Sequence, residues 1–129
     1  MSRRAFTLLE MLAAFAVLGV LVAFCVQLLP AVARQRAAAA QRQAATQEAA
    51  NLLERIAARP WDQLTPAALQ GVGLSSEARR QLPGAKLQVD VFDPAQNPAA
   101  RRIAVCVQWE DRDGLPVRPA RLVAWRYRP

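Results

Sequence analysis

The chain has 129 residues, of which 53% are hydrophobic, and it carries a net charge of +7 without a single histidine. This length allows at most one small globular domain beside any membrane segment. No histidine, no Gly-rich phosphate loop and no Cys/His cluster with zinc spacing are present. The composition therefore predicts neither an enzyme nor a cofactor nor a metal site.

The positive charge has no pattern typical of nucleic-acid binding. All but one of the 17 basic residues are arginine, and they are scattered singly or in pairs, with Lys86 as the exception. A nucleic-acid surface is expected to cluster its basic residues and to interleave them with aromatic ones. Nucleic acid is therefore an unlikely partner, although a DNA-uptake role stays open as a minor alternative.

The main feature of the sequence is an apolar run near the amino terminus. Residues 11–33 contain no charged side chain, and as a helix they span about 35 Å, enough to cross a bilayer core of about 30 Å. Pro30 is expected to bend this helix without ending it. A secretory signal peptide is the competing interpretation, but Glu10 interrupts the apolar core early and no convincing cleavage site follows.

Glu10 is the residue that a plain membrane anchor does not need. An ionisable group at the edge of a membrane helix is costly and is therefore a functional hypothesis that must name a partner. A free α-amino group at Phe6 would lie about one helical turn away. That amine exists only if the chain is cut between Ala5 and Phe6.

Residues 3–12 (RRAFTLLEML) resemble the processing site of type IV pilin-like proteins, which include pilins, minor pilins and pseudopilins of type II secretion. The shared pattern is a basic leader, a small residue, Phe-Thr-Leu-x-Glu and an apolar helix. The resemblance covers about the first 30 residues. It implies that prepilin peptidase cuts between Ala5 and Phe6 and methylates the new amine. It also implies that Glu10, with Thr7 beside it, acts in assembly by attracting the Phe6 amine of a neighbouring subunit.

Two positions depart from the family pattern. The family usually has Gly before the cut, where this chain has Ala5, so slower cleavage is expected. The family's helix-bending Pro comes earlier, near Gln27, so the bend is expected to be shifted toward Pro30.

The chain after the apolar run is expected to be α+β, with five segments in all. We predict a cleaved leader (1–5), a transmembrane and assembly helix (6–33), its soluble continuation (34–59), a variable connecting region (60–85) and an antiparallel sheet (86–129). Residues 34–59 lack Gly and Pro, and small or apolar residues recur there at three- and four-residue steps. This predicted core-facing stripe consists of Ala45, Ala49, Leu52, Leu53 and Ile56.

Turn residues and helix caps predict the elements of the connecting region, and alternating apolar residues predict the strands of the sheet. Trp61 and Leu64 are expected to anchor on the sheet, and short helices are expected after Thr65 and from Ser75 to Leu82, where neither Ser75 nor Ser76 has a nearby base. Alternating residues predict strands over 86–92, 102–110 and 119–128, the last with Val123, Trp125 and Tyr127 on one face.

Acidic residues and cysteines in this part of the chain each allow two interpretations. Residues 111–114 (DRDG) predict a short hairpin turn, and the acidic group of Glu110, Asp111 and Asp113 is read as turn chemistry in preference to a Ca²⁺ site. Cys25 and Cys106 are expected to be too far apart to bridge, and to be small buried residues. Pairing of Cys106 between chains stays open.

The expected function is that of a structural minor pilin or minor pseudopilin, most like an I-type pseudopilin or a V-type minor pilin. The expected partners are other pilins through the helix, prepilin peptidase and an inner-membrane assembly platform. The chain would cross the inner membrane once, with its carboxy-terminal domain in the periplasm. The alternative is a single-pass anchor that presents a periplasmic binding module and never polymerises.

Overall fold

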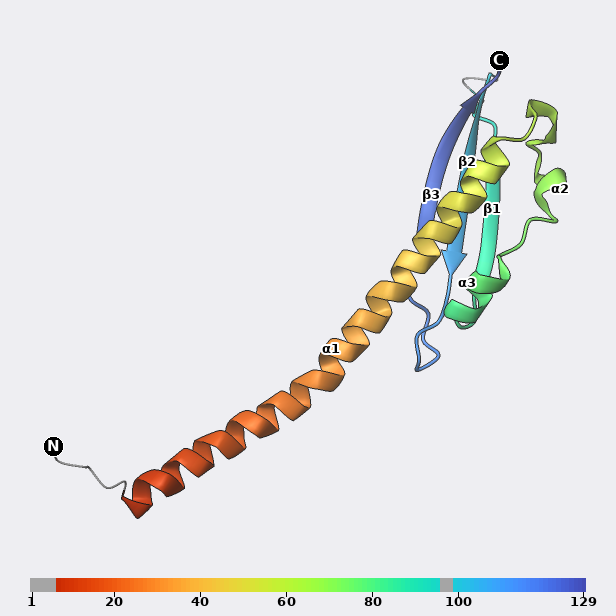
Figure 1. Cartoon of the computed structure of the whole chain (residues 1–129). Coiled ribbons are helices and arrows are strands. Elements are labelled where there is room, and N and C mark those ends of the chain that lie inside the picture. The colour runs from red at the N-terminus through yellow and green to blue at the C-terminus, as the bar shows by residue number, and fades with distance from the viewer. Residues whose placement is uncertain (1–6, 96–98) are drawn as a thin grey trace. The chain divides into compact units, whose positions relative to one another are not determined.

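The computed structural model describes residues 7–95 and 99–129. The predicted leader (1–5) and Phe6 therefore lie outside the described residues, as do residues 96–98, between the first two predicted strands. The chain divides into two units, Met1–Ala37 and Ala38–Pro129, and each is described by itself. Figure 1 labels the elements in chain order.

Helix α1 (Leu8–Ala57) is the longest element and contributes residues to both units. It continues through Pro30 without ending, as predicted. It ends two residues before the predicted Arg59, because its last turn tightens. The Ala58 amide still donates to the Glu54 carbonyl at 2.9 Å, but the Arg59 amide donates to Ile56 at 3.0 Å.

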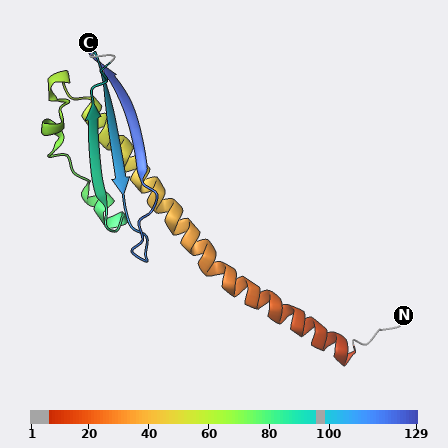
Figure 2. The same ribbon diagram turned by 180° about the vertical axis from the view of Figure 1, so that it is seen from behind.

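The second unit packs the end of α1 against one face of a three-stranded sheet (Figures 1 and 2). Strands β1 (Lys86–Phe92), β2 (Ala100–Gln108) and β3 (Ala120–Tyr127) pair antiparallel in the order β1-β2-β3. This α+β, pilin-like architecture is the predicted one. The core consists of the helix stripe, the inner face of β2 and side chains of the connecting region, the largest fully buried ones being Leu52, Ile56, Leu64, Leu82, Ile103, Val105 and Val107.

The predicted helix stripe is confirmed, with one addition. Ala45, Ala49, Leu52 and Ile56 are buried and Leu53 is partly buried against the same cluster. Glu48, which the periodicity placed on another face, is also buried, with 7% of its surface exposed. Its carboxylate has a partner on another helix, which is described below.

The predicted hairpin turn at residues 111–114 is confirmed. Glu110 and Pro116 form an antiparallel bridge, the Asp111 amide donates to the Leu115 carbonyl at 2.8 Å, and the Val117 amide donates to the Trp109 carbonyl at 3.1 Å. The regular strands β2 and β3 are interrupted from residue 109 to 119, because the Glu110 amide donates to the Pro83 carbonyl at 2.9 Å and Pro116 and Pro119 have no amide to donate. The Asp111 carboxylate accepts the amides of Asp113 at 2.9 Å and Leu115 at 2.8 Å. Turn chemistry is thus the confirmed role of Asp111.

Val123, Trp125 and Tyr127 share a face of β3, as predicted. It is the outer face, whereas Ala120, Leu122 and Ala124 turn toward the core. Neither cysteine is buried as expected. Cys25 is exposed on α1 and Cys106 is half-buried on the outer face of β2.

The connecting region contains a 3-10 helix, η1 (Trp61–Gln63), and two short helices, α2 (Pro66–Leu69) and α3 (Ser76–Gln81). The predicted caps are confirmed. The Thr65 hydroxyl accepts the Ala68 amide at 3.3 Å, and the Ser75 hydroxyl accepts the Ala78 amide at 3.1 Å. Leu64 is fully buried and Trp61 packs against the core, as expected of anchors.

Arg101 fastens this region to the sheet. Its Nη1 donates to the carbonyls of Trp61 at 2.7 Å and Leu64 at 3.2 Å, and its Nε donates to Asp93 at 2.9 Å. The guanidinium also lies over the Trp61 ring, 4.6 Å from the centroid. One planar cation thus satisfies two carbonyls, one carboxylate and one aromatic face, while only 17% of its side chain is exposed.

We expect Arg101→Lys to lower the free energy of unfolding by about 1–3 kcal/mol, because a lysine keeps the charge but cannot hold the forked geometry or the stacking. Thermal and urea unfolding of the detergent-solubilised chain measures this. Arg118→Lys, at an exposed loop position, is the control and should change stability by less than about 0.5 kcal/mol. Equal effects of the two substitutions would contradict the role of Arg101.

Candidate processing and assembly segment

Of the four residues predicted to act in processing and assembly, the structure describes two. Ala5 and Phe6, at the predicted cleavage site, lie outside the described residues, whereas Thr7 and Glu10 are described. The geometry of the segment therefore rests on the start of α1.

Thr7 is the residue that begins α1. Its carbonyl accepts the amides of Glu10 at 3.0 Å and Met11 at 3.2 Å, and its hydroxyl lies 3.4 Å from the Glu10 amide. This is the arrangement of an N-cap with an acidic residue three positions later, the sequence signature of a capping box. This capping role of Thr7 was not predicted, although the Thr-x-x-Glu spacing of residues 7–10 in the sequence is the signal for it.

The first turn of α1 favours a negative charge at Glu10. Unpaired amides at a helix start carry a partial positive charge, which stabilises a carboxylate in the first turn. Glu10 is the acidic residue of that turn, and it is exposed. Within residues 7–95 and 99–129 its side chain has no ion-pair partner.

The turns that follow expose apolar side chains on every side of the helix. The most exposed large ones include Leu8, Leu9, Val20, Leu29 and Phe15. An 18-residue window of α1 has a mean hydropathy of 2.6 and none of it is buried in the chain. Length and composition thus allow this helix to cross a membrane, a test that an amino-terminal signal sequence also passes.

A comparison with known families matches residues 1–26 to the prokaryotic N-terminal methylation motif. This match of the amino-terminal segment points to the type IV pilin-like family. No curated protein and no solved structure matches this chain. The motif implies that the pilin-like chain is processed by prepilin peptidase and assembles with pilins, and together with the apolar helix it fits membrane anchoring.

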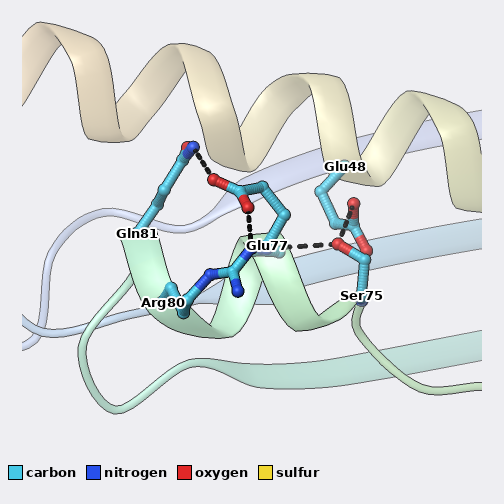
Figure 3. A network of polar contacts seen from close by, with 6 residues as sticks. Glu48, Ser75, Glu77, Arg80 and Gln81 are labelled. Atoms are coloured by element: carbon cyan, nitrogen blue, oxygen red, sulfur yellow. Dashed lines mark hydrogen bonds and ion pairs between the residues drawn. The ribbon is translucent and has the colours of Figure 1, made fainter.

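A second cluster of polar residues joins α1 to α3 (Figure 3). It lies in the second unit, Ala38–Pro129, which we call the soluble unit. The Glu48 carboxylate accepts the Ser75 amide at 2.7 Å and the Ser75 hydroxyl at 3.0 Å. This corrects the expectation that Ser75 has no nearby base. The same hydroxyl caps α3, so Ser75 serves to dock the start of α3 on α1, and Glu48 is the buried acceptor that fixes it.

The outer edge of this cluster is a polar surface groove. Glu77 accepts hydrogen bonds from Arg80 and from Gln81, the latter at 2.6 Å, and the Arg80 contact, with its positive charge, lowers the pKa of Glu77 below its ordinary value. Gln47, Asn51 and Arg55 line a cavity of about 310 Å³ beside it. Both carboxylates here already have partners on neighbouring residues.

The chemistry of the described residues is that of binding and docking. No group of three or more His, Cys, Asp or Glu side chains in ranges 7–95 and 99–129 is placed to hold a metal ion. Ser75 and Glu48 bond to each other and to backbone, an arrangement that positions helices. The features that remain available for contact with other molecules are the start of α1, its apolar surface and the outer face of the sheet.

We expect Thr7→Ala to loosen the first turn of α1, because it removes a cap that contributes about 1 kcal/mol. Hydrogen exchange of the Glu10 and Met11 amides in micelles should become about fivefold faster. Thr7→Ser keeps the hydroxyl and should leave exchange near the original rate. Identical rates in the three proteins would show that the hydroxyl does not cap the helix.

We expect Glu48→Ala to lower the free energy of unfolding by about 1–3 kcal/mol, because the partly buried amide and hydroxyl of Ser75 lose their acceptor. Glu54→Ala, at an exposed position of the same helix, is the matched control and should be nearly neutral. A double-mutant cycle with Ser75→Ala measures the coupling between the two residues. Additive effects would indicate that the contact contributes no stability.

Proposed function

We propose that this chain is a minor pilin or minor pseudopilin, a structural subunit of a type IV pilus or type II secretion filament that acts in filament initiation or at the tip. The observation that carries the proposal is the start of α1. There the methylation motif, a capped helix and an exposed acidic residue of the first turn occur together on a helix with an apolar surface.

The proposed mechanism begins with processing. Prepilin peptidase cuts between Ala5 and Phe6 and methylates the new amine, which keeps its positive charge. Before assembly the chain is held in the inner membrane by the apolar half of α1, with the soluble unit in the periplasm. Removal of the leader also removes two arginines, Arg3 and Arg4, which lowers the net charge of +7 to +5.

Assembly then pairs opposite charges where water is scarce. Helices that pack side by side in a filament bury their apolar surfaces, and at low dielectric a carboxylate without a cation is strongly disfavoured. A neighbouring subunit is accepted only at the axial position where its Phe6 amine meets Glu10. Apolar packing supplies affinity, and the charge pair sets the register.

The soluble unit supports a structural role in preference to catalysis. Its buried carboxylate docks a helix, and its loop aspartate holds a turn. We infer that the unit takes no part in chemistry and acts by contact with other proteins of the machine.

We expect the mature chain to begin at Phe6 and to carry one additional methyl group. Mass spectrometry of the membrane-extracted protein from cells with and without prepilin peptidase measures both. The chain should keep its full length in cells without the enzyme. A Met1 or Ser2 terminus in wild-type cells, or cleavage at the same bond without the enzyme, would end the proposal.

Glu10→Gln separates the charge from the shape of the side chain. Glutamine keeps the capping-box position but has no charge, so processing should continue while incorporation into filaments falls about tenfold, the effect of about 1.4 kcal/mol. Glu10→Asp is the control that keeps the charge. Sedimentation of sheared filaments followed by quantitative immunoblotting measures incorporation. Normal incorporation of Glu10→Gln would show that the charge does not set the register. Absence of the unmodified chain from the filament fraction would favour the anchored binding module that never polymerises.

A further inference from the structure

The outer face of the sheet exposes large apolar side chains. Phe92 and Trp125 are each 52% exposed, Val123 is 46% exposed and Tyr127 is 63% exposed. We call these four residues, together with Arg102 and Arg121, the aromatic face. Figure 2 views the sheet from the side opposite to Figure 1, with α1 behind the strands. An antiparallel sheet with one solvated face normally turns polar residues outward.

Strand β3 shows that this exposure is not a by-product of folding. Ala120, Leu122 and Ala124 occupy inward positions, whereas Trp125 and Tyr127, the two largest apolar side chains of the strand, occupy outward positions. A strand selected only for stability would turn its largest apolar residues toward the core. Contiguous exposed apolar patches on a folded domain mark interaction sites.

The register of the strands places a cation within the aromatic residues. Phe92, Arg102 and Trp125 form one row across the three strands, and the Arg102 guanidinium lies over the Phe92 ring at 5.1 Å. Arg121 lies on the same face of β3, opposite Cys106. Among the described residues neither arginine forms an ion pair.

Negative charge on this face is limited to one residue. Asp90 belongs to the row of Ala104 and Val123, and its carboxylate already accepts the Gln88 amide at 3.1 Å. That neutral amide leaves Asp90 its charge, but Lys86, Arg102 and Arg121 lie on the same outer face, so positive charge is in excess there. Electrostatic complementarity calls for carboxylates on the molecule that covers it.

We propose that the aromatic face docks a different protein, whose contact surface carries aspartate or glutamate side chains beside an apolar depression. Exposed Trp, Tyr, Phe and Arg on a rigid sheet are the residue types enriched at the centre of protein interfaces. A second copy of this chain is disfavoured, because a two-fold contact would place Arg102 and Arg121 against the same cations. The proposal concerns the soluble unit and is independent of leader cleavage and of the charge pair at Glu10.

Photo-cross-linking of the full-length chain in its native cells tests this. Val123 is replaced by the photoreactive p-benzoyl-phenylalanine, with the same replacement of Gln63, an exposed residue of the connecting region, as the matched control. We expect a protein adduct from position 123 only, with the cross-linked peptide of the partner containing Asp or Glu beside apolar residues. Arg121→Glu should reduce the adduct about tenfold, and Lys or Arg in place of the mapped acidic residue should restore it.

Trp125→Ala and, as a second variant, Tyr127→Ser should also reduce the adduct, and unchanged thermal unfolding of these variants shows that the fold is intact. Four outcomes would each overturn the proposal. They are an adduct no stronger than that from position 63, an adduct with a second copy of this chain, an adduct with lipid or nuclease-sensitive material, and a partner peptide without acidic residues. Because cleavage and filament incorporation are measured separately, failure here leaves the proposed function untouched.

Discussion

The soluble unit depends on the packing of the last turns of α1 against the inner face of the sheet. A three-stranded sheet of this size is marginal by itself, and its buried side chains need a second layer. Leu52 and Ile56 provide that layer against Ile103, Val105 and Val107. The helix that carries the apolar segment is thus also the helix that completes the core of the domain, so a truncation that removes the apolar segment must keep residues 45–57 in place.

Two polar contacts fix the parts that apolar packing leaves free. Glu48 holds the start of α3, and Arg101 holds η1 and the approach to α2. Each is a charged group with little exposure. Glu48 bonds to the amide and hydroxyl of Ser75, and Arg101 bonds to two backbone carbonyls and to the Asp93 carboxylate. Such contacts are directional, whereas apolar packing is not, and this explains how a connecting region with little regular structure adopts one course.

Most of the fold, but only part of the surface, could be predicted from the sequence. Periodicity located α1, β1 and the caps at Thr65 and Ser75 because these depend on local spacing. It could not reveal that Glu48 is buried or that β3 turns its aromatics outward, since both depend on which element packs on which face. The hairpin turn at residues 111–114 was predicted correctly, whereas the hydrogen bond of the Glu110 amide to Pro83, a residue distant in sequence, could not be predicted. In the processing segment the motif was plain, whereas the capping role of Thr7 became clear only from the hydrogen bonds.

The position of the helix start has one more consequence. The carbonyl and hydroxyl that accept the Glu10 and Met11 amides at the start of α1 belong to Thr7, which lies after the bond proposed for cleavage. Hydrolysis of that bond would leave both of these acceptors in place. Maturation would then change the charge at this end of the helix and keep the cap that Thr7 provides.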